Sequence, residues 1–164
     1  MKINVVMLKQ DDPKKCSAAK LVKFQLAKNV KKTSSKTLVL DPFAKKTVLN
    51  TDKKLVDSIT GIDCSWSLAD QTFTNNFLGI HRKLPPLFAG NPVNYSKLNK
   101  LTTVEAISAT LFIFGNKNFG IQLLDKFKWG HTFFDLNKDL LEDYSKIESE
   151  NQIISILKEY EIHL

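Results

Sequence analysis

Residues 82–109 read RKLPPLFAGNPVNYSKLNKLTTVEAISA and divide the chain into two parts of different character. Up to about residue 101 the composition is that of a loop: three prolines fix backbone angles and remove N–H donors, and short polar side chains follow Gly90, which permits close backbone approach. Long ordered loops are uncommon in compact domains and tend to be functional. The loop is therefore predicted either to bind a ligand or to connect two halves of a domain rigidly.

The end of this stretch predicts a helix start. Thr102 stands three residues before Glu105, which is the spacing of a capping box, and an apolar run from Val104 to Ile113 follows. The N-terminus of such a helix offers N–H groups and partial positive charge to an anion. A carboxylate or phosphate is thus the ligand expected here.

The residues before the loop alternate between strand and helix patterns. Strands are predicted at 3–8, 37–40, 47–49 and 59–64, and helices at 17–27, 52–59 and 67–77, with Ser17 and Ser67 as caps. Short, continuous apolar runs such as INVVML are typical of strands buried on both faces. This alternation favours a parallel α/β sheet.

The residues after the loop lose the strand pattern. Periodic apolar positions predict four helices, at 104–114, 119–127, 133–144 and 151–160. We therefore expect an α/β half at 1–84 and the loop with a helical half at 85–164, together forming one compact unit.

Composition and charge narrow the class of protein. The chain has 164 residues, 43% of them hydrophobic, which favours a globular protein, and a formal net charge of +7. Nine lysines lie between Lys9 and Lys36 with only Asp11 and Asp12 opposing them. This concentration indicates a polyanion such as nucleic acid as partner, although a lysine-rich surface of a thermophilic protein has the same composition.

Several classes of site lack their signatures. Cys16 and Cys64 do not pair with histidines at metal-ligand spacings, so no metal is expected. Phosphate-binding Walker loops, GxGxxG, HExxH and GxSxG are absent from the sequence. An apolar run long enough to span a bilayer and a signal peptide are absent too, and we expect a cytoplasmic protein without a membrane partner.

Asp63 and Trp66 are the strongest candidates for chemistry among the individual residues. Asp63 is predicted at the end of a buried strand, on the same side as Ser17 and the long loop, where an acid is costly unless it is paired or used. It would also fit as a cap of the following helix. The Trp66 ring is suited either to the core or to contact with a cation such as a sulfonium.

Four blocks of sequence together resemble one family: DPKKCSAAKL at 12–21, LVLDPFA at 38–44, GIDCSW at 61–66 and RKLPPLFAGNPVNY with KLTTVEAISATLFIFG after 82. The chain resembles an archaeal member of the small-subunit rRNA aminocarboxypropyltransferase family along nearly its whole length. The resemblance implies a fold similar to the knotted SPOUT methyltransferases, with a deep trefoil knot.

The resemblance also implies an activity. The family transfers the 3-amino-3-carboxypropyl group of S-adenosylmethionine to N3 of a (methyl)pseudouridine in small-subunit rRNA and releases methylthioadenosine, during ribosome biogenesis. The implied partners are rRNA or the pre-ribosomal subunit, and we expect a monomer. An rRNA methyltransferase that uses the same cofactor, and a non-catalytic assembly factor, are the alternatives.

Carried onto this sequence, the resemblance implies a set of site residues. Asp63 would take or steer the N3 proton, or hold the substrate amino group, and Thr103 would bind the carboxylate of the methionine moiety. The cofactor contacts that it implies are Ser17, Leu40, Pro42, Ile62, Trp66, Ala69, Leu84, Leu87, Asn99 and Thr103. The basic residues expected to contact RNA are Lys14, Lys15, Lys20, Lys23, Arg82 and Lys83.

Overall fold

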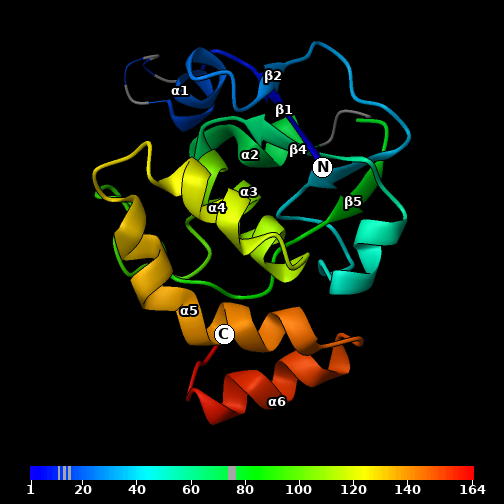
Figure 1. Ribbon diagram of the computed structural model, residues 1–164, viewed down its shortest axis with the longest axis vertical. Helices are drawn as coiled ribbons and strands as arrows, with labels where there is room; N and C mark the ends of the chain where they lie inside the picture. Colours follow the sequence, from blue (N-terminus) through cyan, green and yellow to red (C-terminus); the bar gives the residue numbers. More distant parts are fainter. Residues whose placement is uncertain (11, 13, 15, 74–76) are drawn as a thin grey trace.

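The computed structural model describes residues 1–164 except 11, 13, 15 and 74–76. Its described part contains one sheet of parallel strands and six α-helices. Figure 1 shows how these elements are arranged. The strands are β1 (Lys2–Met7), β2 (Lys28–Asn29), β3 (Thr37–Leu40), β4 (Ser58–Asp63) and β5 (Ile80–Arg82). The predicted parallel α/β sheet is confirmed.

The strand order β2-β1-β4-β3-β5 makes β4 the central strand of the sheet. It pairs in parallel with β1 from Lys2↔Ser58 to Met7↔Asp63 and with β3. All four residues of β3 are buried, as a continuous apolar strand in a parallel sheet requires. The carboxyl ends of these strands therefore meet along one edge, where open α/β sheets bind ligands.

The first helix, α1, runs from Ser17 to Lys23 and is shorter than the predicted 17–27. Its N-cap is Cys16 rather than Ser17: the Cys16 Sγ accepts a hydrogen bond from the Ala19 N–H. Lys28–Asn29, just beyond the predicted helix, forms the short strand β2 beside β1. Both departures follow from tertiary contacts, which outweigh helix propensity over so short a segment.

Three other predictions before residue 84 were wrong in part. The predicted strand at 47–49 makes a single bridge, Thr47↔Lys83, and the predicted helix at 52–59 is the 3-10 helix η1 at Asn50–Lys54. The described part of the predicted helix at 67–77 is η2 at Trp66–Leu68 followed by α2 at Ala69–Thr72, and its positions 74–76 fall outside the described residues. Each of these segments is short, so its apolar spacing fits more than one structure.

The helical half agrees closely with the sequence. It contains α3 (Thr103–Ile113), α4 (Lys117–Leu124), α5 (Gly130–Lys146) and α6 (Asn151–Glu159). The predicted capping box is present, because Glu105 N–H donates to Thr102 Oγ1 and Thr102 N–H donates to the Glu105 carboxylate. The four predicted helices are thus confirmed, and α5 and α6 lie at the far end of the molecule from β1 and β2 (Figure 1).

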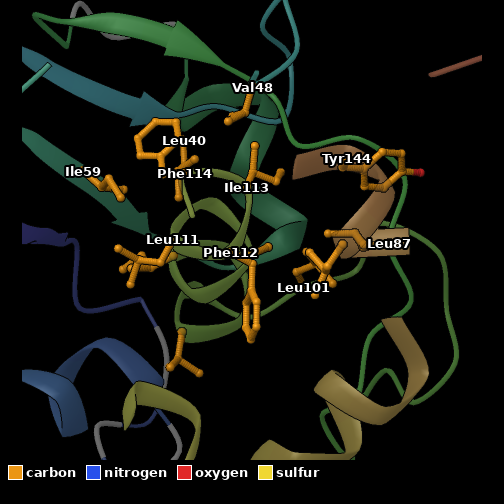
Figure 2. Close-up of a cluster of buried hydrophobic side chains, with 14 of the residues drawn as sticks. Leu40, Val48, Ile59, Leu87, Leu101, Leu111, Phe112, Ile113, Phe114 and Tyr144 are labelled. Carbon is orange, nitrogen blue, oxygen red and sulfur yellow. The ribbon is translucent and has the colours of Figure 1, made fainter. Parts of the chain in front are cut away.

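Helix α3 joins the two halves through one hydrophobic core. At Gly61 of β4 an added Cβ would lie 2.7 Å from Thr103 Cγ2, so glycine is needed for α3 to pack this closely on the central strand. Figure 2 shows the side chains of Leu111 to Phe114 between sheet residues and the residues of α5 and the loop. The core cluster contains side chains from Ile3 to Leu157, so it spans both halves.

Candidate active site

A cavity of about 750 Å³ opens at the carboxyl ends of β3 and β4. It is enclosed by the segment before α1, the turns after these two strands, the loop at 84–102 and the first turn of α3. Its volume is typical of sites for small molecules and cofactors. The long loop and the sheet edge therefore form one site.

Asp63 lies in this cavity at the end of the central strand. Its Oδ2 accepts a hydrogen bond from the Cys16 thiol, with the sulfur 3.0 Å away, and its Oδ1 accepts from the Thr103 hydroxyl at 3.3 Å. The predicted placement of Asp63 at the end of a buried strand, on the same side as Ser17 and the long loop, is thus confirmed. Both partners are donors, which suits an ionised carboxylate.

The Trp66 ring forms part of the cavity wall and is 40% exposed. Its Nε1–H donates to the Leu101 carbonyl at 3.3 Å, which ties the ring to the end of the loop. The Lys100 ammonium lies 4.6 Å from the ring centroid. Trp66 is therefore a cavity residue rather than a core residue, and its face already contacts a cation.

The loop is held in place by the buried carboxylate of Glu105. Its Oε1 accepts from the Gly90 and Asn91 N–H groups, and its Oε2 accepts from Thr102 and from the Asn91 side chain. Gly90 itself packs against the backbone of Phe133 so closely that any Cβ would clash, as its predicted role requires. The loop is thus a rigid wall of the cavity.

Ser17 connects the two helices that begin at the cavity. Its Oγ accepts a hydrogen bond of 3.2 Å from the N–H of Val104, so the first turn of α1 is attached to the first turn of α3. The structure thereby brings Ser17 and Thr103 together from positions far apart in the sequence.

Most residues that were predicted to contact a cofactor line this cavity. They are Ser17, Leu40, Pro42, Ile62, Trp66, Ala69, Leu84, Asn99 and Thr103. Leu87 is the exception: its side chain is fully buried in the core, near Leu101 in Figure 2, and its N–H and C=O pair with Asn99. We therefore assign Leu87 to the core, where it supports Asn99 and the loop.

Two of the basic residues at the start of the long loop, His81 and Arg82, are paired within the fold. Arg82 makes an ion pair of 2.9 Å with the buried carboxylate of Asp52, and His81 lies between Asp41 and the Phe77 carbonyl. These partners give Arg82 a structural role within the fold, and its predicted RNA contact stays a prediction. Lys83 is exposed and lines the cavity.

The predicted lysines near α1 differ in their surroundings. Lys14 and Lys23 are exposed, while the ammonium of Lys20 lies 4.7 Å from the centroid of the Phe127 ring. The prediction for Lys15 falls outside the described residues. None of the three described lysines lines the cavity, so they lie apart from the pocket itself.

Comparisons with known proteins identify the family. The sequence model of the family described as "Ribosome biogenesis protein, C-terminal" matches residues 38–161. A curated 16S rRNA aminocarboxypropyltransferase from Methanococcoides burtonii is 44% identical over 163 residues, covering 96% of this chain and 94% of its own. Another, from Saccharolobus solfataricus, is 44% identical over 161 residues, covering 97% of this chain and 95% of its own.

This chain belongs to the 16S rRNA aminocarboxypropyltransferase family. A solved structure agrees with that membership: the "SAM-dependent rRNA:acp-transferase Tsr3 from Vulcanisaeta distributa" matches with a TM-score of 0.84 and 36% identity. The match covers 88% of this chain and 82% of the solved one. The family that the sequence blocks indicated is confirmed.

A second family description, "Possible Fer4-like domain in RNase L inhibitor", matches residues 1–35 of this aminocarboxypropyltransferase family member. Iron–sulfur clusters are held by four cysteine thiolates. Residues 1–35 contain only Cys16, whose sulfur is engaged with Asp63 and Ala19. These residues do not fit a cluster, and they instead supply β1, α1 and β2 to the shared sheet.

The part of the chain that the structure describes lacks both a cluster of metal ligands and a helix that could cross a membrane. Within the described residues, no three His, Cys, Asp or Glu side chains gather where they would hold a metal ion. In the same part of the chain, no helix has the length and apolar character to cross a bilayer.

Some residues that line the cavity were not predicted from the sequence. Cys16 stands before the predicted helix cap and Lys100 before the predicted capping box, yet both line the cavity. Asn91, which also lines it, was singled out only as a polar loop residue. No local signal marked Cys16, because the residues preferred at helix N-caps are Ser, Thr, Asp, Asn and Gly, which favoured Ser17.

Proposed function

We propose that this chain transfers the 3-amino-3-carboxypropyl group of S-adenosylmethionine to small-subunit rRNA and releases methylthioadenosine. The observation that carries the proposal is the cavity at the carboxyl ends of β3 and β4, which combines Asp63, Trp66 and the capped start of α3. It occurs in a chain that is 44% identical to curated 16S rRNA aminocarboxypropyltransferases over nearly its full length.

The residues of the cavity fit S-adenosylmethionine. Leu40, Ile62, Ala69 and Leu84 offer apolar surface to an adenine and a methylthio group. The Trp66 ring, whose face contacts the Lys100 ammonium in this structure, would offer its negative ring surface to the sulfonium in place of that lysine. When bound, S-adenosylmethionine would supply the alkyl group on a carbon that its sulfonium activates.

The first turn of α3 fits the amino-acid end of the same molecule. Thr103 is the first residue of the helix and lines the cavity. A helix N-terminus favours a carboxylate, by typically 0.3–1 kcal/mol when exposed and up to about 2 kcal/mol when partly buried. Thr103 would thereby fix the alkyl chain in one direction, with the methyl group turned toward the apolar wall.

This orientation decides which group is transferred. A sulfonium has three activated carbons, and the one in line with the nucleophile reacts, because positioning alone supplies about 7–11 kcal/mol of the barrier. We infer that N3 of a pseudouridine attacks the aminocarboxypropyl carbon. A bond from N3 to that carbon forms, the bond from the carbon to sulfur breaks, and N3 loses its proton.

Asp63 is the carboxylate in the cavity that could accept or steer the proton lost by N3. It lies at the cavity with donors on both oxygens, which hold it in one orientation. We infer that Asp63 accepts or steers the N3 proton. Alternatively, Asp63 holds the substrate amino group. These two roles are distinguished by Asp63→Asn, which lowers cofactor affinity only if Asp63 holds the amino group.

We infer that rRNA approaches over Lys83 at the cavity and over the lysines of the α1 region outside it. Lys83 is exposed at the cavity itself, and Lys14, Lys20 and Lys23 lie on or before α1. Ammonium groups of this kind contact phosphates without reading sequence. An rRNA substrate would place this enzyme in the cytoplasm, and we propose that it acts there as a monomer.

We also propose that the chain forms the deep trefoil knot expected from the SPOUT-like resemblance, within one compact unit made of 1–84 and 85–164. In support, the chain leaves β5 at one edge of the sheet and returns across it, so that α3 packs on β4 and meets α1 through Val104 and Ser17. A crystal structure whose backbone is unknotted would overturn this inference.

The small-molecule product tests the proposed activity. The purified chain should convert S-adenosylmethionine to methylthioadenosine when small-subunit rRNA lacking the modification is present, as measured by chromatography. S-adenosylhomocysteine as product would identify a methyltransferase instead. Absence of S-adenosylmethionine binding by calorimetry would identify a non-catalytic assembly factor.

A further inference from the structure

The thiol of Cys16 makes two hydrogen bonds that fix its orientation. Its S–H donates to Asp63 Oδ2 with the sulfur 3.0 Å away, and its sulfur accepts the N–H of Ala19 at 3.2 Å. Cys16 is half-buried and lines the cavity. The hydrogen bond to Asp63 uses the thiol proton, and the hydrogen bond from Ala19 uses a lone pair of the sulfur. The S–H bond therefore points toward Asp63.

The other oxygen of Asp63 is held from a different helix. Thr103, at the start of α3, donates its hydroxyl to Oδ1 at 3.3 Å. The starts of α1 and α3 are themselves joined by the hydrogen bond from Val104 N–H to Ser17 Oγ. The Asp63 carboxylate is thus held at both oxygens by two attached helices, and only Cys16 holds Oδ2 among the hydrogen bonds within the described residues.

We propose that Cys16 is a positioning residue for the transfer reaction: its S–H holds the Asp63 carboxylate in the orientation that faces the reacting group. Cys16 acts through Asp63 and not on the substrates. This inference rests on the proposed function, since the orientation of Asp63 matters only if Asp63 acts in transfer.

The protonation of the thiol is suited to this role. Burial, the hydrogen bond to Asp63 and the negative charge of Asp63 raise the pKa of Cys16 to about 11, against a smaller lowering by the backbone N–H groups of Ala19 and Ala18. The thiol therefore keeps its proton at neutral pH, and the donor is present throughout the working range. It is also a poor nucleophile there, because the thiolate is the reactive form.

Substitutions of Cys16 test the proposal in the transfer assay. Cys16→Ala removes the donor, and kcat should fall about 10- to 100-fold, the effect of one hydrogen bond to a charged group, while KM for S-adenosylmethionine stays within about twofold. Cys16→Ser keeps a donor for Asp63 and an acceptor for Ala19, and it should restore most of kcat. If Cys16 had a purely structural role, both variants would change the melting temperature. The selective loss of kcat in Cys16→Ala and its recovery in Cys16→Ser would then not be seen.

The assay separates failure of this proposal from failure of the proposed function, because the wild-type chain is measured beside the variants. Wild-type kcat in folded Cys16→Ala would overturn the positioning role. So would a change confined to KM for S-adenosylmethionine, which would make Cys16 a cofactor contact. An inactive wild-type chain would instead reject the function on which the proposal rests.

A second measurement needs no activity. The rate of iodoacetamide modification of Cys16, followed by peptide mass spectrometry so that Cys64 is counted separately, reports the thiolate fraction as pH rises. In Asp63→Ala this rate should rise at lower pH than in the wild-type chain, because the hydrogen bond and the charge that raise the Cys16 pKa are gone. An unchanged profile would show that the thiol does not interact with Asp63 and would overturn the proposal.

Discussion

Replacing Glu105 with glutamine removes one acceptor atom from the network that holds the loop of the cavity. The Glu105 carboxylate is fully buried and accepts hydrogen bonds from the Gly90 and Asn91 N–H groups at Oε1. At Oε2 it accepts from the Thr102 N–H at 2.7 Å and from the Asn91 side-chain amide at 2.9 Å. In Glu105→Gln an NH2 group takes the place of one oxygen.

The expected loss of stability follows from the donors that lose their acceptor. If the amide oxygen stays with Gly90 and Asn91 N–H, the Thr102 N–H and the Asn91 side-chain N–H face another donor. Each buried donor left without a partner costs about 1–3 kcal/mol, so Glu105→Gln should lower the free energy of unfolding by about 2–6 kcal/mol. Total stabilities of about 5–15 kcal/mol make this a large fraction.

Urea unfolding of the wild-type chain and the variant measures this loss as a shift of the midpoint at constant slope. Glu142→Gln is a matched control, because the Glu142 side chain is exposed and forms a surface pair of 3.1 Å with Lys146, worth at most about 1 kcal/mol. If Glu105→Gln shifts the midpoint no more than this control does, the buried network does not hold the loop and the reasoning is refuted.

Three further predictions address the site and the helical end. Trp66→Ala should weaken S-adenosylmethionine binding in calorimetry by about 1–2 kcal/mol, or about five- to thirtyfold, through loss of the ring face; unchanged affinity would contradict a cation contact. Asp63→Asn should lower kcat for transfer while cofactor affinity stays near that of the wild-type chain; a parallel loss of affinity would favour a role in holding the amino group. The hydrogen bond from Tyr160 to Asp143, the largest cause, raises the pKa of Tyr160 to about 12. This hydrogen bond therefore contributes fully to stability below the ordinary tyrosine pKa of about 10, and the contribution is lost as pH rises toward 12. Between these pH values the free energy of unfolding should fall more steeply with pH in the wild-type chain than in Tyr160→Phe.

The sequence predicted those elements whose local signals agree with their tertiary contacts. Thr37–Leu40 is a strand within its predicted bounds, because a continuous apolar run fits a strand buried on both faces. The start of α3 was equally clear, since Thr102 and Glu105 satisfy each other's backbone groups locally. The placement of Asp63 at the sheet edge followed from the alternation of strands and helices.

The parts that could not be predicted depend on partners distant in the sequence. The strand at Ile80–Arg82 is short and polar, and it exists because it pairs with β3 at the edge of the sheet. The Arg82 guanidinium is paired with Asp52, 30 residues away, and no local pattern in the sequence indicates this ion pair. Leu87 was expected from the resemblance to contact the cofactor, but its side chain is fully buried in the core.

Transfer of doubly labelled S-adenosylmethionine to rRNA tests the central claim most directly. The purified chain is incubated with unmodified small-subunit rRNA and with cofactor that carries one label in the carboxyl group and another in the methyl group. We predict that the carboxyl label enters the RNA and the methyl label leaves in methylthioadenosine. Methyl label in the RNA, or no label from either position, would contradict aminocarboxypropyl transfer by this chain.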